Sequence, residues 1–549
     1  MKFLVLAFIT TLFSVSLFAQ LNVIQYKLDN GLTVILNPDK NQSTISGAVA
    51  VNTGSKNDPS DATGISHYLE HLLFKGTTEL GTTNYKAKKV HLDSIYYLYD
   101  ELAKTKEEEK RDEIQQRINY HSVEASQYAM PNEFDKLLKS IGSTGINATT
   151  NNDLTIYYNT FPSHQAQKWL NIYAHRFLNP VFRSFQSELE VVYEEKNRAM
   201  DNLQIRILEA YNREFYRNHP YGEKTTLGTT EHLKNPSLKK MYDYYKTYYV
   251  ANNMALIVSG NFEIGTIKPF IKENFGKLKT GIIPKNKIAP PTAFLGKKLV
   301  KKRITPIKVG IYGFRTVPQF HEDEAPLVVA DYLLQNDANT GFIDELTVNN
   351  KIMMAFSFSD QMDEAGNQTF IIIPKVFIQS FNKVEKLLFS QLDKLKNGSF
   401  SDQLLTSVKN EIYKNNQLEI EDIQNRVYLM ASAFRAGLTW KELKKKLESV
   451  KKVTKEDIQR VAKQYFGENY LAIHSRTGFP KKEKLDKPAF QALKINQDKN
   501  STNANNCLSK PDFKRFTCKH KDDLLCRPCL CGNNKFSYRR KSFYWEARV

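Results

Sequence analysis

Cysteine is absent from the first 506 residues of the 549-residue chain, and all five cysteines lie in the last 43 residues. The main part of the chain therefore cannot rely on disulfides, and its stability must come from packed apolar cores. At about 100–200 residues per domain, the length leaves room for two to four domains. A small disulfide-bonded scaffold is excluded.

Long hydrophobic runs are also scarce. Lys2 precedes an apolar run, residues 3–18, and Ala19 follows the run. A positive residue, a short apolar run and a small residue before the cleavage point are typical of a secretory signal peptide, here residues 1–19. An uncleaved membrane anchor is the alternative, although the run is short for a span. The mature chain is predicted to have no integral membrane span and to be exported, to the periplasm or the extracellular space.

No nucleic-acid-binding motif accompanies the positive charge of the chain. Lysine and arginine number 78 against 59 aspartate and glutamate, which gives a net charge of +19. The residues from Ser501 onward carry +7 of this excess, and much of the rest lies in the lysine-rich stretch 285–308. Charge divided between separate segments favours solvated surface over a nucleic-acid footprint, so no nucleic-acid partner is expected.

The last part of the chain, residues 481–549, is predicted to be an irregular basic tail. Four of its residues have the spacing of zinc ligands: His520, Cys526, Cys529 and Cys531. Three other interpretations compete with a metal site, namely a disulfide-bonded tail, a disordered tail, and a sequence foreign to the fold, such as an out-of-frame end. The sequence leaves these alternatives open.

Between these ends the chain is predicted to form two halves. The first half, residues 20–278, opens with two strand-like segments that meet at Asn30-Gly31, a strong hairpin signal. A linker with several prolines and lysines spans residues 279–300. The second half, residues 301–480, again combines strand and helix patterns.

A weak internal repeat links the two halves. Residues 240–258 and 456–474 each show a helix, a short loop and a strand, with Tyr249 aligned to Tyr465. Each copy lies at the end of its half, where a duplicated domain would place it. The repeat therefore favours two homologous α+β domains over coincidence.

One short motif, a histidine pair four residues apart with a glutamate between, indicates chemistry. On a helix, His67, Glu70 and His71 share one side. Imidazoles at i and i+4 can bind one metal ion, and the glutamate can reach a water molecule at that ion. The alternative, a solvated helix face, is disfavoured because chance gives this motif in only roughly one such chain in a hundred. Asp61 or Thr63 is expected to cap the helix.

A stable zinc site needs a third protein ligand, and an acidic segment further along the chain supplies candidates. Glu188 and Glu195 are seven residues apart, so on a helix they share one stripe, whereas Glu190 and Glu194 point elsewhere. The apolar residues expected on that stripe are Val191, Val192 and Ala199. A carboxylate on an apolar stripe is costly to bury unless it binds a cation or accepts hydrogen bonds. The alternative is an exposed acidic helix with salt bridges.

These motifs resemble a known family of zinc peptidases. The segment from His67 to Thr77 closely resembles the inverted zinc motif of the insulinase, pitrilysin and mitochondrial-processing-peptidase family. Four further segments carry the resemblance: residues 48–55, 145–150, 188–195 and 219–222. The resemblance covers about residues 22–480, and it is to the metal-bearing N-terminal half of an exported bacterial member.

The resemblance implies one Zn²⁺ ion per chain, bound by His67, His71 and Glu195. It implies Glu70 as the general base that activates water, and Glu188 as a carboxylate that orients the site without touching the metal. The implied fold is α+β, with two homologous domains that each contain an antiparallel-rich β-sheet covered by α-helices.

The resemblance also implies a strand that binds substrate. Asn147 and Ala148 would lie on an edge strand that pairs with a peptide or an unfolded protein; alternatively, Gly145 and Asn147 only make a turn. The implied function is a zinc-dependent endopeptidase that hydrolyses peptide bonds in small or unfolded polypeptides. The alternatives are a non-catalytic partner subunit, a peptide-binding module with the same fold, and a truncated inactive half of a longer peptidase.

Two features depart from the family. The stretch from His71 to Glu195 is longer than usual, and the excess, at about residues 86–134, is predicted to be a helical hairpin inserted in the first domain. The hairpin is either surface decoration or a gate or docking element. Because the family closes two half-units around substrate, a second half-unit is expected, from a homodimer or a partner subunit.

Overall fold

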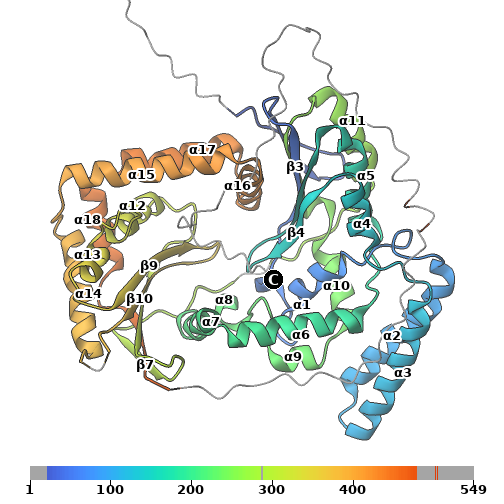
Figure 1. Ribbon diagram of the computed structural model, residues 1–549, viewed down its shortest axis with the longest axis horizontal. Coiled ribbons are helices and arrows are strands. Elements are labelled where there is room, and N and C mark those ends of the chain that lie inside the picture. Colours follow the sequence, from blue (N-terminus) through green and yellow to red (C-terminus); the bar gives the residue numbers. More distant parts are fainter. Residues whose placement is uncertain (1–20, 286–287, 377, 479–500, 502–503, 505–549) are drawn as a thin grey trace, which may run out of the picture.

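The computed structural model describes residues 21–285, 288–376 and 378–478, together with Ser501 and Ala504. The predicted signal peptide and all five cysteines lie outside the described residues. Figure 1 shows two regions, one from blue to green and one from yellow to orange, each built around its own β-sheet. Helices cover both sheets.

The first sheet has six strands in the order β1-β2-β6-β3-β5-β4. The strands are β1 (Ile24–Lys27), β2 (Thr33–Pro38), β3 (Thr44–Val51), β4 (Thr144–Thr150), β5 (Thr155–Pro162) and β6 (Met254–Gly260). Neighbouring strands are antiparallel except for β2 and β6, which are parallel. The predicted hairpin at Asn30-Gly31 joins β1 to β2, and Gly31 has a φ of +84°, in the left-handed region that favours glycine.

The second sheet has five strands in the order β7-β11-β8-β10-β9. The strands are β7 (Lys298–Lys302), β8 (Val309–Thr316), β9 (Met354–Gln361), β10 (Gly366–Ile373) and β11 (Tyr470–Ser475). In both sheets the last strand is parallel to an early strand on one side and antiparallel to the next strand on the other. Apart from β1, the two sheets share one topology, and β6 and β11, which end the sequence repeat, occupy equivalent places. The predicted pair of homologous α+β domains is confirmed.

The helices follow the same division. Those of the first domain are α1 (Ile65–Leu72), α2 (Tyr85–Lys104), α3 (Glu108–Ser126), α4 (Glu133–Ser140), α5 (Ala166–Leu178), α6 (Phe185–Asp201), α7 (Leu203–Phe215), α8 (Pro220–Glu223), α9 (Thr230–Lys234), α10 (Leu238–Tyr248) and α11 (Ile264–Phe275). Those of the second domain are α12 (Glu324–Leu334), α13 (Phe342–Val348), α14 (Phe381–Lys396), α15 (Asp402–Glu421), α16 (Ile423–Arg435), α17 (Trp440–Ser449) and α18 (Lys455–Tyr465).

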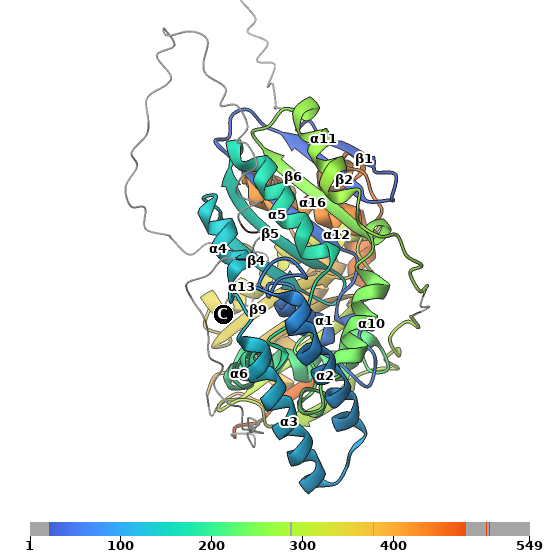
Figure 2. The ribbon, with the colours of Figure 1, turned by 90° about the vertical axis from the view of Figure 1, so that its right-hand side faces the viewer.

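One helix of each domain packs on the sheet of the other domain. Val427 and Met430 of α16 belong to a core cluster with apolar residues of β2, β3, β5 and β6. Tyr211 and Phe215 of α7 belong to a core cluster with residues of β8, β10 and β11. Gly313 in β8 permits the close approach of α7, because a Cβ there would lie 2.4 Å from the Tyr211 hydroxyl oxygen. In Figure 2, α5 and α11 lie in front of the first sheet and α16 lies behind it.

Helices α2 and α3 form the predicted hairpin, which projects from the first domain (Figure 1). Within the described part of the chain, no helix combines the length and apolar character that a membrane span requires. Two residues of the predicted tail contact the first domain. Ser501 donates a backbone hydrogen bond to Glu133 Oε1 at 2.6 Å, and Ala504 is buried in the core of that domain.

Candidate metal centre

Helix α1 presents the histidine pair, and its first turn is fixed by Asp58. The Asp58 carboxylate accepts hydrogen bonds from the backbone N–H groups of Gly64, at 2.7 Å, and Ser66, at 3.1 Å. The expectation that Asp61 or Thr63 caps the helix is wrong. Gly64, with a φ of +87°, turns the chain so that these N–H groups face the buried Asp58, while Asp61 is exposed.

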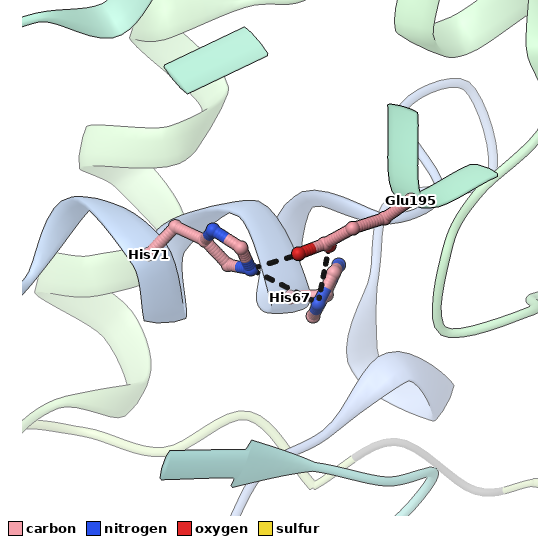
Figure 3. A group of neighbouring side chains, drawn as sticks. All are labelled: His67, His71 and Glu195. Atoms are coloured by element: carbon pink, nitrogen blue, oxygen red, sulfur yellow. Dashed lines mark hydrogen bonds and ion pairs between the residues drawn. The ribbon is translucent and has the colours of Figure 1, made fainter. Parts of the chain in front are cut away.

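Three side chains from two helices converge in front of α1. His67 and His71 lie one turn apart on α1, and Glu195 comes from α6 (Figure 3). The Nε2 atoms of the two histidines are 3.2 Å apart, and each lies 3.5 Å from Glu195 Oε2. The structure therefore brings together the three residues that the sequence analysis selected as metal ligands.

The spacing of these atoms suits a zinc ion. Zn–N and Zn–O bonds of about 2.0–2.2 Å place tetrahedral ligands roughly 3.3–3.6 Å apart, close to the three distances in the site. Burial and the neighbouring charge of His71 lower the pKa of His67 to about 3, so its imidazole is neutral and keeps a lone pair for a metal. Two imidazoles and one carboxylate form a donor set that zinc sites use. Among the described residues, no other group of three potential ligands is this close.

Glu188, one heptad before Glu195 on α6, orients His71. Its Oε1 lies 2.9 Å from His71 Nδ1, and its other oxygen is paired with Lys75. Because a carboxylate accepts, Nδ1 carries the donated proton and Nε2 remains available to a metal. Burial acts to raise the pKa of Glu188, but the hydrogen bond from His71 and the charge of Lys75 outweigh burial and hold the pKa below its usual value.

Glu70 lies on the same helix as the two histidines but does not belong to the group of three converging ligands. Its side chain is buried, and it accepts a hydrogen bond from the Thr150 hydroxyl at the end of β4. Burial raises the pKa of Glu70 to about 7, although the charge of His71 and the bond from Thr150 act in the opposite direction. A carboxyl group that titrates near neutrality can both take up and return a proton.

Strand β4 forms the open edge of the first sheet beside α1. Asn147 is exposed on this edge, and its side-chain oxygen accepts a hydrogen bond from the Ala148 N–H at 2.9 Å. Asn147 and Ala148 pair with Tyr158 and Tyr157 of β5 on the inner side. Both residues are thus in a strand rather than in the turn that was the alternative.

Three residues near the site were not selected from the sequence. Thr150 and Lys75 fell within quoted motifs, but only the fold shows that they contact Glu70 and Glu188. Arg176 of α5 is fully buried among four aromatic rings, with its guanidinium carbon 4.2 Å from the centroid of Phe74, and none of its side-chain nitrogens donates a hydrogen bond to a described residue. Its charge lowers the pKa of Glu70.

Two family models match the chain. One described as Insulinase (Peptidase family M16) matches residues 33–90 and 117–229, and one described as Peptidase M16 inactive domain matches residues 236–412. The residues between the two segments of the Insulinase match, 91–116, lie in the α2–α3 hairpin, as expected of an insertion. The first match contains the histidine pair of α1 together with Glu188 and Glu195 of α6.

A similar protein is the zinc protease PqqE of Helicobacter pylori, which is 27% identical over 401 residues that cover 70% of this chain and 76% of PqqE. The crystal structure of a protease from Helicobacter pylori has a TM-score of 0.67 at 22% identity, over 83% of this chain and all of that chain. The first half of the periplasmic protease PqqL from Escherichia coli has a TM-score of 0.63 at 16% identity, over 83% and 92% of the two chains.

The complete PqqL structure matches 86% of this chain, which corresponds to 51% of PqqL, with a TM-score of 0.62. At these identities the solved structures show a common fold. The two family models extend across both domains and include the histidine pair with its glutamate. The chain therefore belongs to the insulinase family of zinc peptidases, peptidase family M16.

Proposed function

We propose that this chain is a zinc-dependent endopeptidase that hydrolyses peptide bonds in small or unfolded polypeptides. The observation that carries the proposal is the convergence of His67, His71 and Glu195 at the spacing of zinc ligands, with Glu70 on the same side of α1. A non-catalytic binding module would need neither three converging ligands nor a buried carboxyl group beside them.

The three ligands would hold one Zn²⁺ ion per chain. Zinc bound there polarises a carbonyl group and makes a nucleophile of water at neutral pH. Glu70 acts as the general base, which takes a proton from the attacking water and delivers it to the leaving amine. The Thr150 hydroxyl fixes one Glu70 oxygen, so the other is left to face the reacting atoms. Glu188 fixes the ring of His71.

Strand β4 is proposed to hold the substrate. An extended peptide can add to this edge through main-chain hydrogen bonds, which are largely independent of side chains. Asn147 and Ala148 would then contact the peptide backbone near the metal. The added segment must be extended and must have free main-chain groups, which is why small or unfolded polypeptides are the proposed substrates.

A second half-unit is proposed to complete the enzyme. This chain matches the structure of the first half of PqqL and about half of complete PqqL. A homodimer or a partner subunit would supply the other half. The chain is also proposed to be exported to the periplasm or the extracellular space, because it begins with the pattern of a signal peptide and PqqL is described as periplasmic.

Metal removal tests the proposed function. Purified full-length protein is expected to contain about one zinc ion per chain and to cleave a quenched fluorescent peptide. A chelator should abolish cleavage, and added zinc should restore it, because the metal supplies the electrophile. Cleavage that persists after complete loss of zinc would contradict the proposal, as would zinc-loaded protein that cleaves no peptide either alone or with a second half-unit.

Replacement of Glu188 by glutamine is expected to weaken zinc affinity by roughly 10–100-fold, as changes to groups that orient a ligand commonly do. The amide can still contact His71 Nδ1 but no longer carries the negative charge that favours its proton. Zinc affinity can be measured by competition with a chromogenic chelator. Replacement of Glu190 by glutamine, on the same helix and away from the metal, is the matched control. Equal affinities in both variants would contradict the role of Glu188.

A further inference from the structure

Six polar residues from the two domains meet at the end of β4. We call them the interdomain charge cluster. Its members are Lys56, Asp153 and Tyr221 of the first domain, and Asp363, Glu364 and Arg435 of the second. Charged groups removed from water cost free energy unless they are paired in good geometry, so such a cluster at a domain boundary restricts how the domains can sit.

Asp153 is the centre of the cluster. Its side chain is only 2% exposed. It lies 2.8 Å from the Lys56 ammonium, accepts a hydrogen bond from the Tyr221 hydroxyl at 2.8 Å, and lies 3.3 Å from Arg435 Nη1. Arg435 is the C-terminal residue of α16 in the second domain, so the Asp153 carboxylate binds groups from both domains.

The second domain contributes a turn as well as α16. Asp363 and Glu364 lie between β9 and β10, and their carboxylates are 2.9 and 3.3 Å from the Lys56 ammonium. Arg435 Nε is 3.4 Å from Asp363 Oδ1. The backbone N–H of Glu364 donates to the Tyr221 hydroxyl at 3.1 Å. Side chains and backbone of the second domain thus contact the same small region of the first.

That region is continuous with the candidate catalytic site. Asp153 lies in the turn between β4 and β5, three residues after Thr150, whose hydroxyl donates to Glu70. The Asn151 side chain accepts the N–H of Asp153 at 2.8 Å, which keeps the turn compact. Gly54 packs against it so closely that a Cβ would lie 2.2 Å from the Asn151 carbonyl oxygen. A shift of the turn therefore moves Thr150 and the end of β4.

We propose that Asp363 and Arg435 are positioning residues, through which the second domain holds Asp153, and with it Thr150 and Glu70, in the geometry needed for proton transfer. The proposal rests on the proposed peptidase function. A general base acts only within hydrogen-bond reach of its proton, and a misplacement of about 1 Å can cost on the order of 100-fold in rate. The second domain, which supplies none of the proposed metal ligands, thereby acts on catalysis.

The same helix offers a matched control. Arg426 of α16 pairs across the domain boundary with Asp39 at 2.7 Å, and its side chain is 7% exposed, against 9% for Arg435. Asp39 follows β2 at the end of the sheet where Pro38 pairs with Gly260, whereas the β4–β5 turn lies at the opposite end. Arg426→Gln therefore breaks an interdomain ion pair whose arginine is as buried as Arg435, at a site remote from Thr150.

The test compares Arg435→Gln and Asp363→Asn with Arg426→Gln in the full-length, zinc-loaded protein. The first two variants are expected to lose about tenfold in kcat for peptide cleavage, with unchanged zinc content. Arg426→Gln is expected to keep kcat within about twofold of the unaltered protein, even if its thermal midpoint falls as far as those of the other two variants. Arg435→Lys, which restores the charge, should recover part of kcat. Equal losses of kcat in the variants of Arg426 and Arg435, or none in Arg435→Gln and Asp363→Asn, would overturn the proposal.

Hydrogen exchange gives a readout that does not require activity. Amides of residues 151–155 are expected to exchange faster in Arg435→Gln and Asp363→Asn than in Arg426→Gln, because the turn loses its anchors. If the unaltered protein binds zinc but cleaves no peptide, either alone or with a second half-unit, the proposed function fails. Hydrogen exchange still decides whether the second domain holds this turn. Indistinguishable exchange in all variants would overturn the positioning. Should Arg435→Gln not fold, Arg435→Lys and Asp363→Asn provide the same comparison.

Discussion

Replacement of Glu70 by glutamine is expected to lower the turnover of peptide cleavage by a factor of about 10²–10⁴, the usual contribution of a positioned acid or base. Zinc content should stay unchanged, because Glu70 is outside the ligand set of His67, His71 and Glu195. The glutamine carbonyl can still accept the Thr150 hydrogen bond, but the amide cannot take a proton. Turnover and zinc per chain are measured on the same preparation.

Folding of this variant should be preserved. The pKa of Glu70 is raised by burial from an ordinary value of 4.5 to about 7, so the ionised carboxylate costs folding free energy once the pH exceeds the ordinary value. The uncharged amide removes that cost, and the thermal midpoint should not fall at pH 7. Loss of zinc in proportion to activity would show instead that Glu70 is a ligand.

Replacement of Glu195 by glutamine is expected to remove the metal and, with it, all measurable cleavage. The amide oxygen is a much weaker zinc ligand than a carboxylate, and two imidazoles alone do not hold zinc stably. Zinc per chain should fall from about one to well below one in dialysed protein. Excess zinc should rescue this variant only in part.

The neighbouring Glu194 supplies the control for this experiment. Glu194 lies on the same helix, but its side chain points about 100° away from that of Glu195. Glu194→Gln should therefore retain zinc and most of the activity. If Glu194 proved essential and Glu195 dispensable, the phase of α6 relative to the metal would be wrong. Burial raises the pKa of Glu195, so a neutral side chain there should not weaken folding in the absence of metal.

The candidate site could be predicted where its geometry is local. The shared face of His67, Glu70 and His71 follows from helical spacing, and the heptad between Glu188 and Glu195 places both carboxylates on one stripe of α6. That α6 faces α1 did not follow from spacing and came from resemblance to the family. The division into two homologous α+β domains followed from the sequence repeat. The antiparallel-rich sheet covered by helices in each domain came from the resemblance to the family.

Contacts between distant parts of the chain could not be predicted in this way. The cap of α1 is Asp58 rather than a nearer residue, because Gly64 reverses the chain. Thr150 contacts Glu70 only because β4 lies beside α1 in the fold, and no local sequence pattern predicts that the strand and the helix are neighbours. The pairing of Asp153 with Arg435 joins two domains, so neither sequence segment alone indicates it.

The exchange of helices between the domains has a consequence for biosynthesis. One of the two apolar faces of the first sheet is covered by α16, which belongs to the second half of the chain. The N-terminal domain therefore cannot finish burying its sheet while it is the only part synthesised. Until α16 emerges, that face stays accessible to chaperones and to other chains. Such a delay would be compatible with the proposed export, because a polypeptide that crosses a membrane in unfolded form must not complete its folding beforehand.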